Sequence, residues 1–73
     1  MDNYKEAIID FTKVVGMDSH YYEAYRNRGD VNAKIGKYHD ALVDYSIAVE
    51  LQKKCPMSYA GRAAVNTKLK LYE

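Results

Sequence analysis

The feature that most constrains the fold of this chain is an internal repeat. Residues 4–15 align with residues 38–49 at an offset of 34 positions, pairing Tyr4 with Tyr38, Ala7 with Ala41, Asp10 with Asp44, and Val15 with Val49. Residues 25–38 align with residues 59–72 at the same offset, so that Tyr25, Arg28, Val31, Asn32, Lys34 and Tyr38 recur as Tyr59, Arg62, Val65, Asn66, Lys68 and Tyr72. Two separate stretches with one period predict a stack of similar short units.

Each unit is predicted to consist of two helices. The apolar residues of segment 38–51 are three and four positions apart, which places them on one stripe of an amphipathic helix: Tyr38, Ala41, Leu42, Tyr45, Ala48 and Val49. Residues 4–15 repeat that spacing, and no segment alternates as a strand does. The sequence therefore predicts an all-α fold of four helices, at about residues 4–15, 20–35, 38–52 and 56–72, arranged as antiparallel helix-turn-helix repeats of an α-solenoid.

Residues that favour helix ends lie between these segments. Gly36 interrupts the pattern where a left-handed residue would end a helix. Asp18 or Ser19 can cap the helix that follows, and Pro56 suits the first turn of the last helix because its missing N–H is not needed there.

Composition narrows the possible functions. The chain has 73 residues, enough for one domain at most, and a domain of this size buries only about 60% of the surface that its unfolded chain exposes. Eleven basic and ten acidic residues are spread along it for a net charge of +1, which argues against a nucleic-acid partner. A single cysteine excludes an internal disulfide, and no apolar run approaches the ~18 residues of a membrane span. With no leader segment apparent, a cytoplasmic location is expected.

The repeat resembles the tetratricopeptide repeat. The family pattern of an aromatic residue, Leu-Gly and Tyr on the first helix, with Ala and a large aromatic on the second, is matched by Tyr25-x-x-Arg28-Gly29-x-x-Asn32 and Ala41-x-x-x-Tyr45-x-x-Ala48. The resemblance covers nearly all of residues 1–73: a second helix at 4–15, a full repeat at 22–55, and the first helix of a further repeat at 56–72.

Some positions depart from that pattern. Arg28 stands where leucine is usual and Asn32 where an aromatic is usual, and Arg62 and Asn66 repeat the change. These departures put polar groups near the seam between helices, where each needs a hydrogen-bond partner.

The resemblance implies a protein-interaction module, a scaffold or adaptor segment, rather than an enzyme. In this family the first helices of successive repeats form a concave face that binds a peptide or partner protein. The positions that would line it here are Glu23, Arg26, Asn27, Asp30, Lys34, Met57, Ala60, Gly61, Ala64 and Lys68. The alternative is a structural module in which the helices mediate self-association and bind no separate ligand.

The two end helices favour self-association. Asn3 and Glu6 form a capping-box pattern, which predicts a helix start at about residue 4, and the alignment with residues 38–49 makes this helix the second of its pair. Each end helix carries apolar residues that a neighbouring repeat would cover: Ile8, Phe11 and Val15 at one end, and Tyr59, Val65 and Leu69 at the other. Homo-oligomers formed through these helices are therefore expected, either by stacking or by exchange of helices at Gly36.

Other motifs are better explained by structure than by chemistry. Arg28-Gly29-Asp30 spells a cell-adhesion tripeptide, but it falls in the middle of a predicted helix. His20 and His39 lack further ligands at metal-binding spacing, so neither a metal nor a cofactor is expected.

Possible catalytic groups have equally ordinary explanations. Cys55 has no base beside it and is predicted to be a free or half-buried thiol. Asp40, Asp44 and Glu50, together with Lys37, are predicted to form a solvated outer face of one helix.

Overall fold

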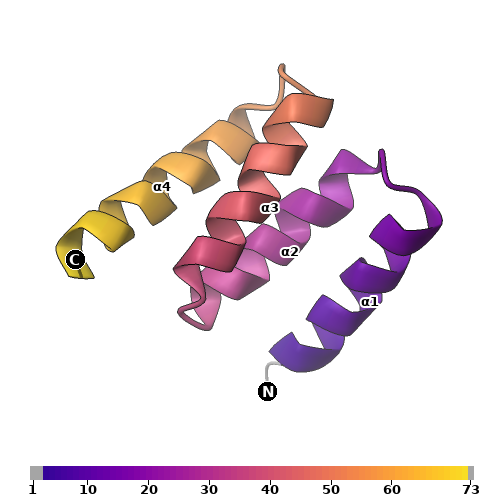
Figure 1. The fold of residues 1–73 in the computed structure, drawn as a ribbon, viewed down its shortest axis with the longest axis horizontal. Coiled ribbons are helices and arrows are strands. Elements are labelled where there is room, and N and C mark those ends of the chain that lie inside the picture. Colours follow the sequence, from indigo (N-terminus) through magenta and orange to yellow (C-terminus); the bar gives the residue numbers. More distant parts are fainter. Residues whose placement is uncertain (1–2, 73) are drawn as a thin grey trace.

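The computed structural model describes residues 3–72 and contains four helices: α1 (Tyr4–Met17), α2 (Tyr22–Lys34), α3 (Tyr38–Leu51) and α4 (Pro56–Tyr72). Consecutive helices run antiparallel and are joined by short loops (Figure 1). No strand occurs within this range. The predicted all-α fold of four helices is confirmed, with α1 two residues longer than expected and α2 starting two residues later.

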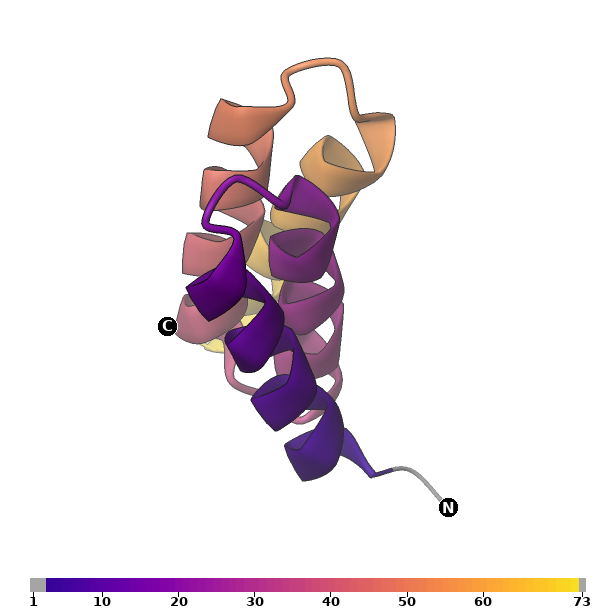
Figure 2. The same ribbon diagram turned by 90° about the vertical axis from the view of Figure 1, so that its right-hand side faces the viewer.

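The helices pack unequally. α2 contacts all three other helices, and α3 packs against both α2 and α4. Among the described residues, α1 packs on α2 alone and has no buried residue, so it lies at one side of the bundle (Figures 1 and 2). The centre of the fold is therefore the α2–α3 hairpin, with α4 laid against it.

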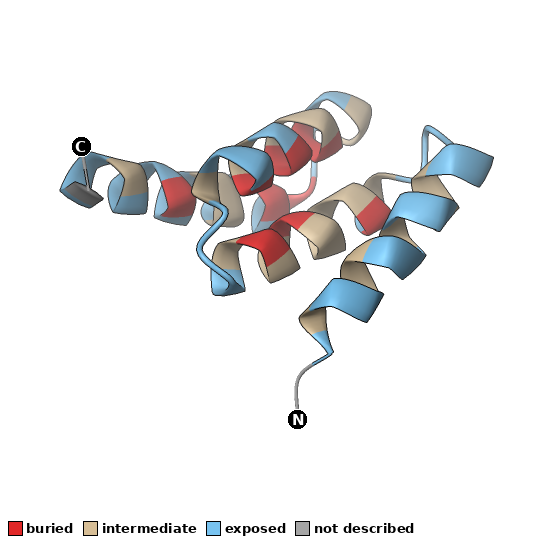
Figure 3. Ribbon diagram, turned by 60° about the horizontal axis from the view of Figure 1, so that its bottom comes forward, coloured by how far each residue is buried: buried red, intermediate tan, exposed pale blue. Residues whose placement is uncertain are grey.

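Small residues around one large aromatic make the core. Ala41 and Ala48 of α3 are fully buried, Tyr45 is 3% exposed, and Val65 of α4 is 2% exposed (Figure 3). Alanines at the contact let neighbouring helix axes approach closely. Asp40, the neighbour of Ala41 in α3, is exposed as predicted.

Tyr45 occupies a slot between two glycines. A Cβ built on Gly29 would lie 3.1 Å from the Tyr45 ring, and one built on Gly61 would lie 2.5 Å from it. Gly29 belongs to α2 and Gly61 to α4, so the ring joins three helices. This close approach explains why glycine stands within both helices despite its low helix propensity.

The turn between α2 and α3 is a Schellman motif. Gly36 has φ +84, the left-handed region that glycine tolerates. The Lys37 N–H donates to the Asn32 carbonyl at 2.8 Å, and the Gly36 N–H donates to the Ala33 carbonyl at 3.2 Å, which satisfies carbonyls at the end of α2. The predicted role of Gly36 is confirmed.

The predicted N-caps are wrong. Asn3 makes no side-chain capping bond at the start of α1. α2 begins after Tyr21, because the Asp18 carboxylate instead accepts from the His20 N–H at 3.0 Å in the preceding turn. A short polar side chain that closes a turn on its own backbone is not available to cap a helix three residues further on.

The predicted end stripes are half correct. Ile8, Phe11 and Val15 of α1 are only half-buried, as expected for a helix packed on one neighbour. Val65, however, is buried in the core, and Leu69 packs against it. These two α4 residues face α3, so of the three apolar residues predicted to be exposed on α4, Tyr59 alone is.

Gly61→Ala should lower the free energy of unfolding by about 1–3 kcal/mol, because the new methyl group would overlap the confined Tyr45 ring. Gly16→Ala is the matched control: no atom lies within 4 Å of its Cβ position, and alanine favours a helix by up to about 1 kcal/mol. Chemical denaturation of both variants measures the difference. Equal effects would show that the ring does not depend on the glycine slot.

Candidate functional site

The predicted partner-binding residues lie on two helices that contact each other. Glu23 and Lys34 of α2 are exposed, while Arg26, Asn27 and Asp30 are half-buried. On α4 the corresponding residues are exposed apart from the half-buried Gly61: Met57, Ala60, Gly61, Ala64 and Lys68. We call this set the α2–α4 face.

Arg26 links the two halves of the α2–α4 face. Its Nη1 lies 3.7 Å from Met57 Sδ and 4.0 Å from Cys55 Sγ, and its Nη2 donates to Asn27 Oδ1 at 3.2 Å. Its Nε is buried without a hydrogen-bond partner. Within the described residues no carboxylate bonds to this guanidinium, and its acceptors are the Asn27 amide oxygen and two weakly accepting sulfur atoms.

Asp30 is partly committed to the core. The Tyr45 hydroxyl donates to the Asp30 carboxylate from beneath the face. Burial of the ring, and then this hydrogen bond, raise the pKa of Tyr45 above its ordinary value. The hydroxyl of a nearly buried tyrosine needs such a partner. Asp30 therefore positions the Tyr45 ring, a role that helix periodicity alone did not indicate.

Cys55 lies just before α4 and is free and buried, more so than the half-buried thiol predicted. The hydroxyl of the fully buried Ser58, which makes no other hydrogen bond within the described residues, has the largest effect on the pKa of this thiol, followed by the Ser58 N–H. With a smaller contribution from Arg26, these groups lower the pKa of the Cys55 thiol below its ordinary value, against the opposing effect of burial. The thiol adjoins the α2–α4 face through Arg26, a proximity that the sequence did not reveal.

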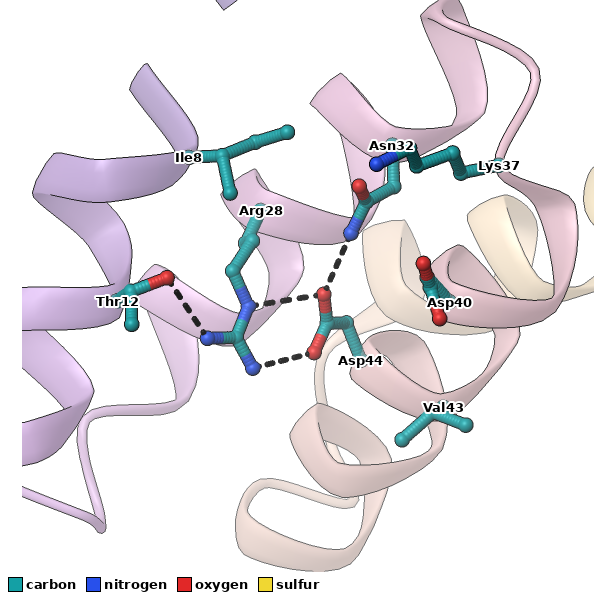
Figure 4. Close-up of a pocket in the computed structure, with 8 residues that line it drawn as sticks. All are labelled: Ile8, Thr12, Arg28, Asn32, Lys37, Asp40, Val43 and Asp44. Atoms are coloured by element: carbon teal, nitrogen blue, oxygen red, sulfur yellow. Dashed lines mark hydrogen bonds and ion pairs between the residues drawn. The ribbon is translucent and has the colours of Figure 1, made fainter. Parts of the chain in front are cut away.

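A polar cluster lies on the other side of α2. Arg28 donates to Asp44 through Nε at 3.0 Å and Nη2 at 2.7 Å, and the Asn32 amide donates to the same carboxylate at 3.0 Å (Figure 4). Arg28 also donates to Thr12 of α1 at 3.2 Å. The hydrogen bond to Asp44 is the main reason that the pKa of Arg28 is raised.

This cluster corrects the prediction of a solvated acidic face. Asp40 and Glu50 are exposed, but Asp44 is 3% exposed and points toward α2. The bidentate pair with Arg28 and the bond from Asn32 satisfy the buried carboxylate. Arg28 and Asn32, the polar residues that depart from the repeat pattern, therefore find their hydrogen-bond partner in one residue, Asp44.

An open cavity of about 320 Å³ lies over the cluster. It is bounded by α1, α2 and α3 and lined by Ile8, Thr12, Arg28, Asn32, Lys37, Asp40, Val43 and Asp44 (Figure 4). Arg28 and Asp44 neutralise each other there, and the two other charged lining residues, Lys37 and Asp40, carry opposite charges, so the cavity has no net charge to offer a ligand.

The remaining motifs fall on separate elements. His20 and His39 are exposed in the α1–α2 loop and on α3. No three His, Cys, Asp or Glu side chains within residues 3–72 are grouped as metal ligands. Arg28-Gly29-Asp30 lies inside α2, and all three residues make contacts to α3.

Comparison with known proteins supplies no further assignment. No protein-family model, curated protein or solved structure matches the chain. No helix within the described residues is both long and apolar enough to cross a membrane. The function is therefore inferred from the chain's own residues.

Asp44→Ala should lower the free energy of unfolding by about 3 kcal/mol, because it leaves the Arg28 guanidinium and the buried Asn32 amide without their shared acceptor. Asp40→Ala, one turn away and exposed, should cost under about 0.5 kcal/mol. Urea unfolding followed by circular dichroism compares the two variants. A similarly small loss of unfolding free energy in both variants would show that Asp44 is solvated, as first predicted.

Ser58→Ala should raise the pKa of the Cys55 thiol, since it removes the group that lowers that pKa most. The thiolate is the reacting form, so at a pH below the pKa of both proteins the variant should be alkylated by iodoacetamide more slowly than wild type. At a pH above both pKa values the two rates should converge. An unchanged pH profile of alkylation would exclude Ser58 as the cause.

Proposed function

We propose that this chain is a protein-interaction module of the tetratricopeptide type, and that its α2–α4 face binds an extended peptide. Two facts support the family assignment: the 34-residue period, and a Tyr45 ring that joins helices of successive units through Gly29 and Gly61. The packing of α3 against both α2 and α4 agrees with a continuous stack of helical hairpins.

The observation that carries the ligand proposal is the position of Arg26. It is half-buried between α2 and α4, its Nη1 lies beside Met57 of α4, and its guanidinium bonds to no carboxylate of the described residues. An arginine held in this way presents planar donors to an acidic group of a ligand. The ligand is therefore a peptide with an acidic side chain or a terminal carboxylate at Arg26.

The α4 half of the face suits a peptide backbone. Ala60 and Ala64 are exposed and lie one turn apart, with Gly61 between them. Small side chains allow an extended chain to approach the helix closely. Met57 at one end adds an adaptable apolar contact, and Lys68 at the other adds a positive charge.

Arg26→Gln should lower the affinity for such a ligand at least about tenfold, because it removes the charge-assisted bonds while keeping a polar side chain. The probe is a fluorescent peptide enriched from a display library of unstructured peptides, and its Kd is measured by anisotropy. Lys53→Gln is the matched control, since Lys53 is an exposed cation of the α3–α4 loop. Its Kd should stay within about twofold of wild type.

Two results would contradict this proposal. The first is a library that yields no saturable peptide. The second is a peptide whose affinity is unchanged in Arg26→Gln but lost in Glu50→Gln, which would place the binding surface on α3 instead.

A further inference from the structure

The interface between α2 and α3 recurs at the two ends of the molecule, one half at each end. The residues of α3 that are buried in the fold are Ala41, Asp44, Tyr45, Ala48 and Val49. Their repeat equivalents on α1 are Ala7, Asp10, Phe11, Val14 and Val15, and none of these is buried. α1 packs on α2 alone, so the part of this surface that includes the exposed Asp10 has no second helix to cover it.

α4 carries the opposite side. The α2 residues at the seam with α3 are Tyr25, Arg28, Gly29 and Asn32, all buried or half-buried. Their repeat equivalents on α4 are Tyr59, Arg62, Ala63 and Asn66, of which Arg62 alone is half-buried and the rest are exposed. These four residues lie on a different side of α4 from Gly61 and Val65, which pack toward α3.

The polar groups of the two halves match. The Arg62 guanidinium stacks over the Tyr59 ring at 5.4 Å, as Arg28 stacks over Tyr25 at 5.6 Å. Arg62 on the exposed side of α4 therefore already has the conformation that Arg28 has when it is paired with Asp44. Asp10 is exposed, and within the described residues neither its carboxylate nor the Arg62 guanidinium has an ion-pair partner. Arg62, Asn66 and Asp10 are the same three residue types that bond as Arg28, Asn32 and Asp44.

A second pair of positions changes together. Within the molecule the Tyr45 hydroxyl donates to Asp30. At the equivalent positions Phe11 lacks the hydroxyl, and Ala64 lacks the carboxylate that would need it. When α1 packs against α4, this pair of positions therefore buries neither an unpaired hydroxyl nor an unpaired carboxylate. The contact does not have to offset the free energy of removing such a group from water.

The turn that joins α2 to α3 is not repeated after α4. Lys70 stands at the position of Gly36 and lies within α4, which runs on to Tyr72. A lysine does not tolerate the positive φ that Gly36 adopts, so α4 does not end in that turn.

We propose that the chain associates head to tail with a second copy of itself, with α1 of one molecule packed on the Tyr59–Asn66 side of α4 of the next. In the contact Asp10 accepts from Arg62 and Asn66 of the neighbouring copy, and Phe11 packs on its Ala63. The contact is heterologous, so each molecule keeps one free surface of each kind and the assembly grows as an open stack. It uses surfaces other than the α2–α4 face and does not depend on peptide binding.

The test is a charge exchange followed by sedimentation velocity from low to high micromolar concentration. Wild type should increase in mass with concentration. Asp10→Arg alone places two guanidinium groups opposite each other in the contact, and Arg62→Asp alone places two carboxylates there, so each variant should need at least about tenfold more protein to associate. An equimolar mixture of the two variants again pairs opposite charges wherever the two kinds of molecule alternate, and it should associate as wild type does.

Glu50→Arg is the control, because it makes the same change of charge on an exposed position outside the contact. It should associate like wild type, and circular dichroism should show that all variants remain helical. A wild-type protein that is monomeric throughout would overturn the proposal. So would single variants that associate normally, or a mixture that does not recover association.

Discussion

The fold depends on the confinement of one tyrosine. Tyr45 is the largest side chain near the centre, and the residues around it are small: Gly29 on α2, Gly61 on α4 and Ala41 on its own helix. Without a Cβ on either glycine, three helices approach the same ring, and the ring fills the space that they would otherwise leave open. The hydroxyl meets Asp30, so burial of the ring leaves no polar group unsatisfied. A chain this short has few other apolar contacts with which to join α4 to the α2–α3 hairpin.

The Arg28–Asp44–Asn32 cluster adds orientation to that packing. An apolar seam tolerates small rotations of one helix against another, whereas a bidentate ion pair holds α2 and α3 at one rotation. Through Thr12 the same arginine reaches α1, which otherwise packs on α2 with half-buried side chains. The net stabilisation of a buried ion pair is small, because both groups lose their water. The small apolar core alone does not fix how the helices are rotated against one another. The cluster therefore contributes chiefly to the arrangement of the helices.

The two proposed interaction surfaces differ in what they offer a partner. The α2–α4 face has a fixed guanidinium beside small residues, which suits an extended ligand with an acidic group. The open sides of α1 and α4 carry complementary halves of an interface already present inside the molecule, which suits another helix of the same repeat. Both surfaces arise from one repeated plan. Each unit uses one side of its first helix to pack on the next helix and leaves another side free.

Much of the fold could be predicted from the sequence, because helical periodicity and the repeat are local or translational properties. The 34-residue offset, the apolar stripe of α3 and the turn at Gly36 each indicated the correct element without knowledge of contacts. Periodicity did not reveal which polar residues are buried. Asp44 was predicted to be solvated because a charged residue in a helical pattern is ordinarily assigned to the exposed side. Its burial is favourable only because Arg28 and Asn32 of α2 donate hydrogen bonds to its carboxylate. The same holds for Cys55 beside Arg26 and for Asp30 beneath Tyr45. Such pairs join residues far apart in the chain, and the free energy of a polar group depends on its partner, so tertiary structure alone decided their roles.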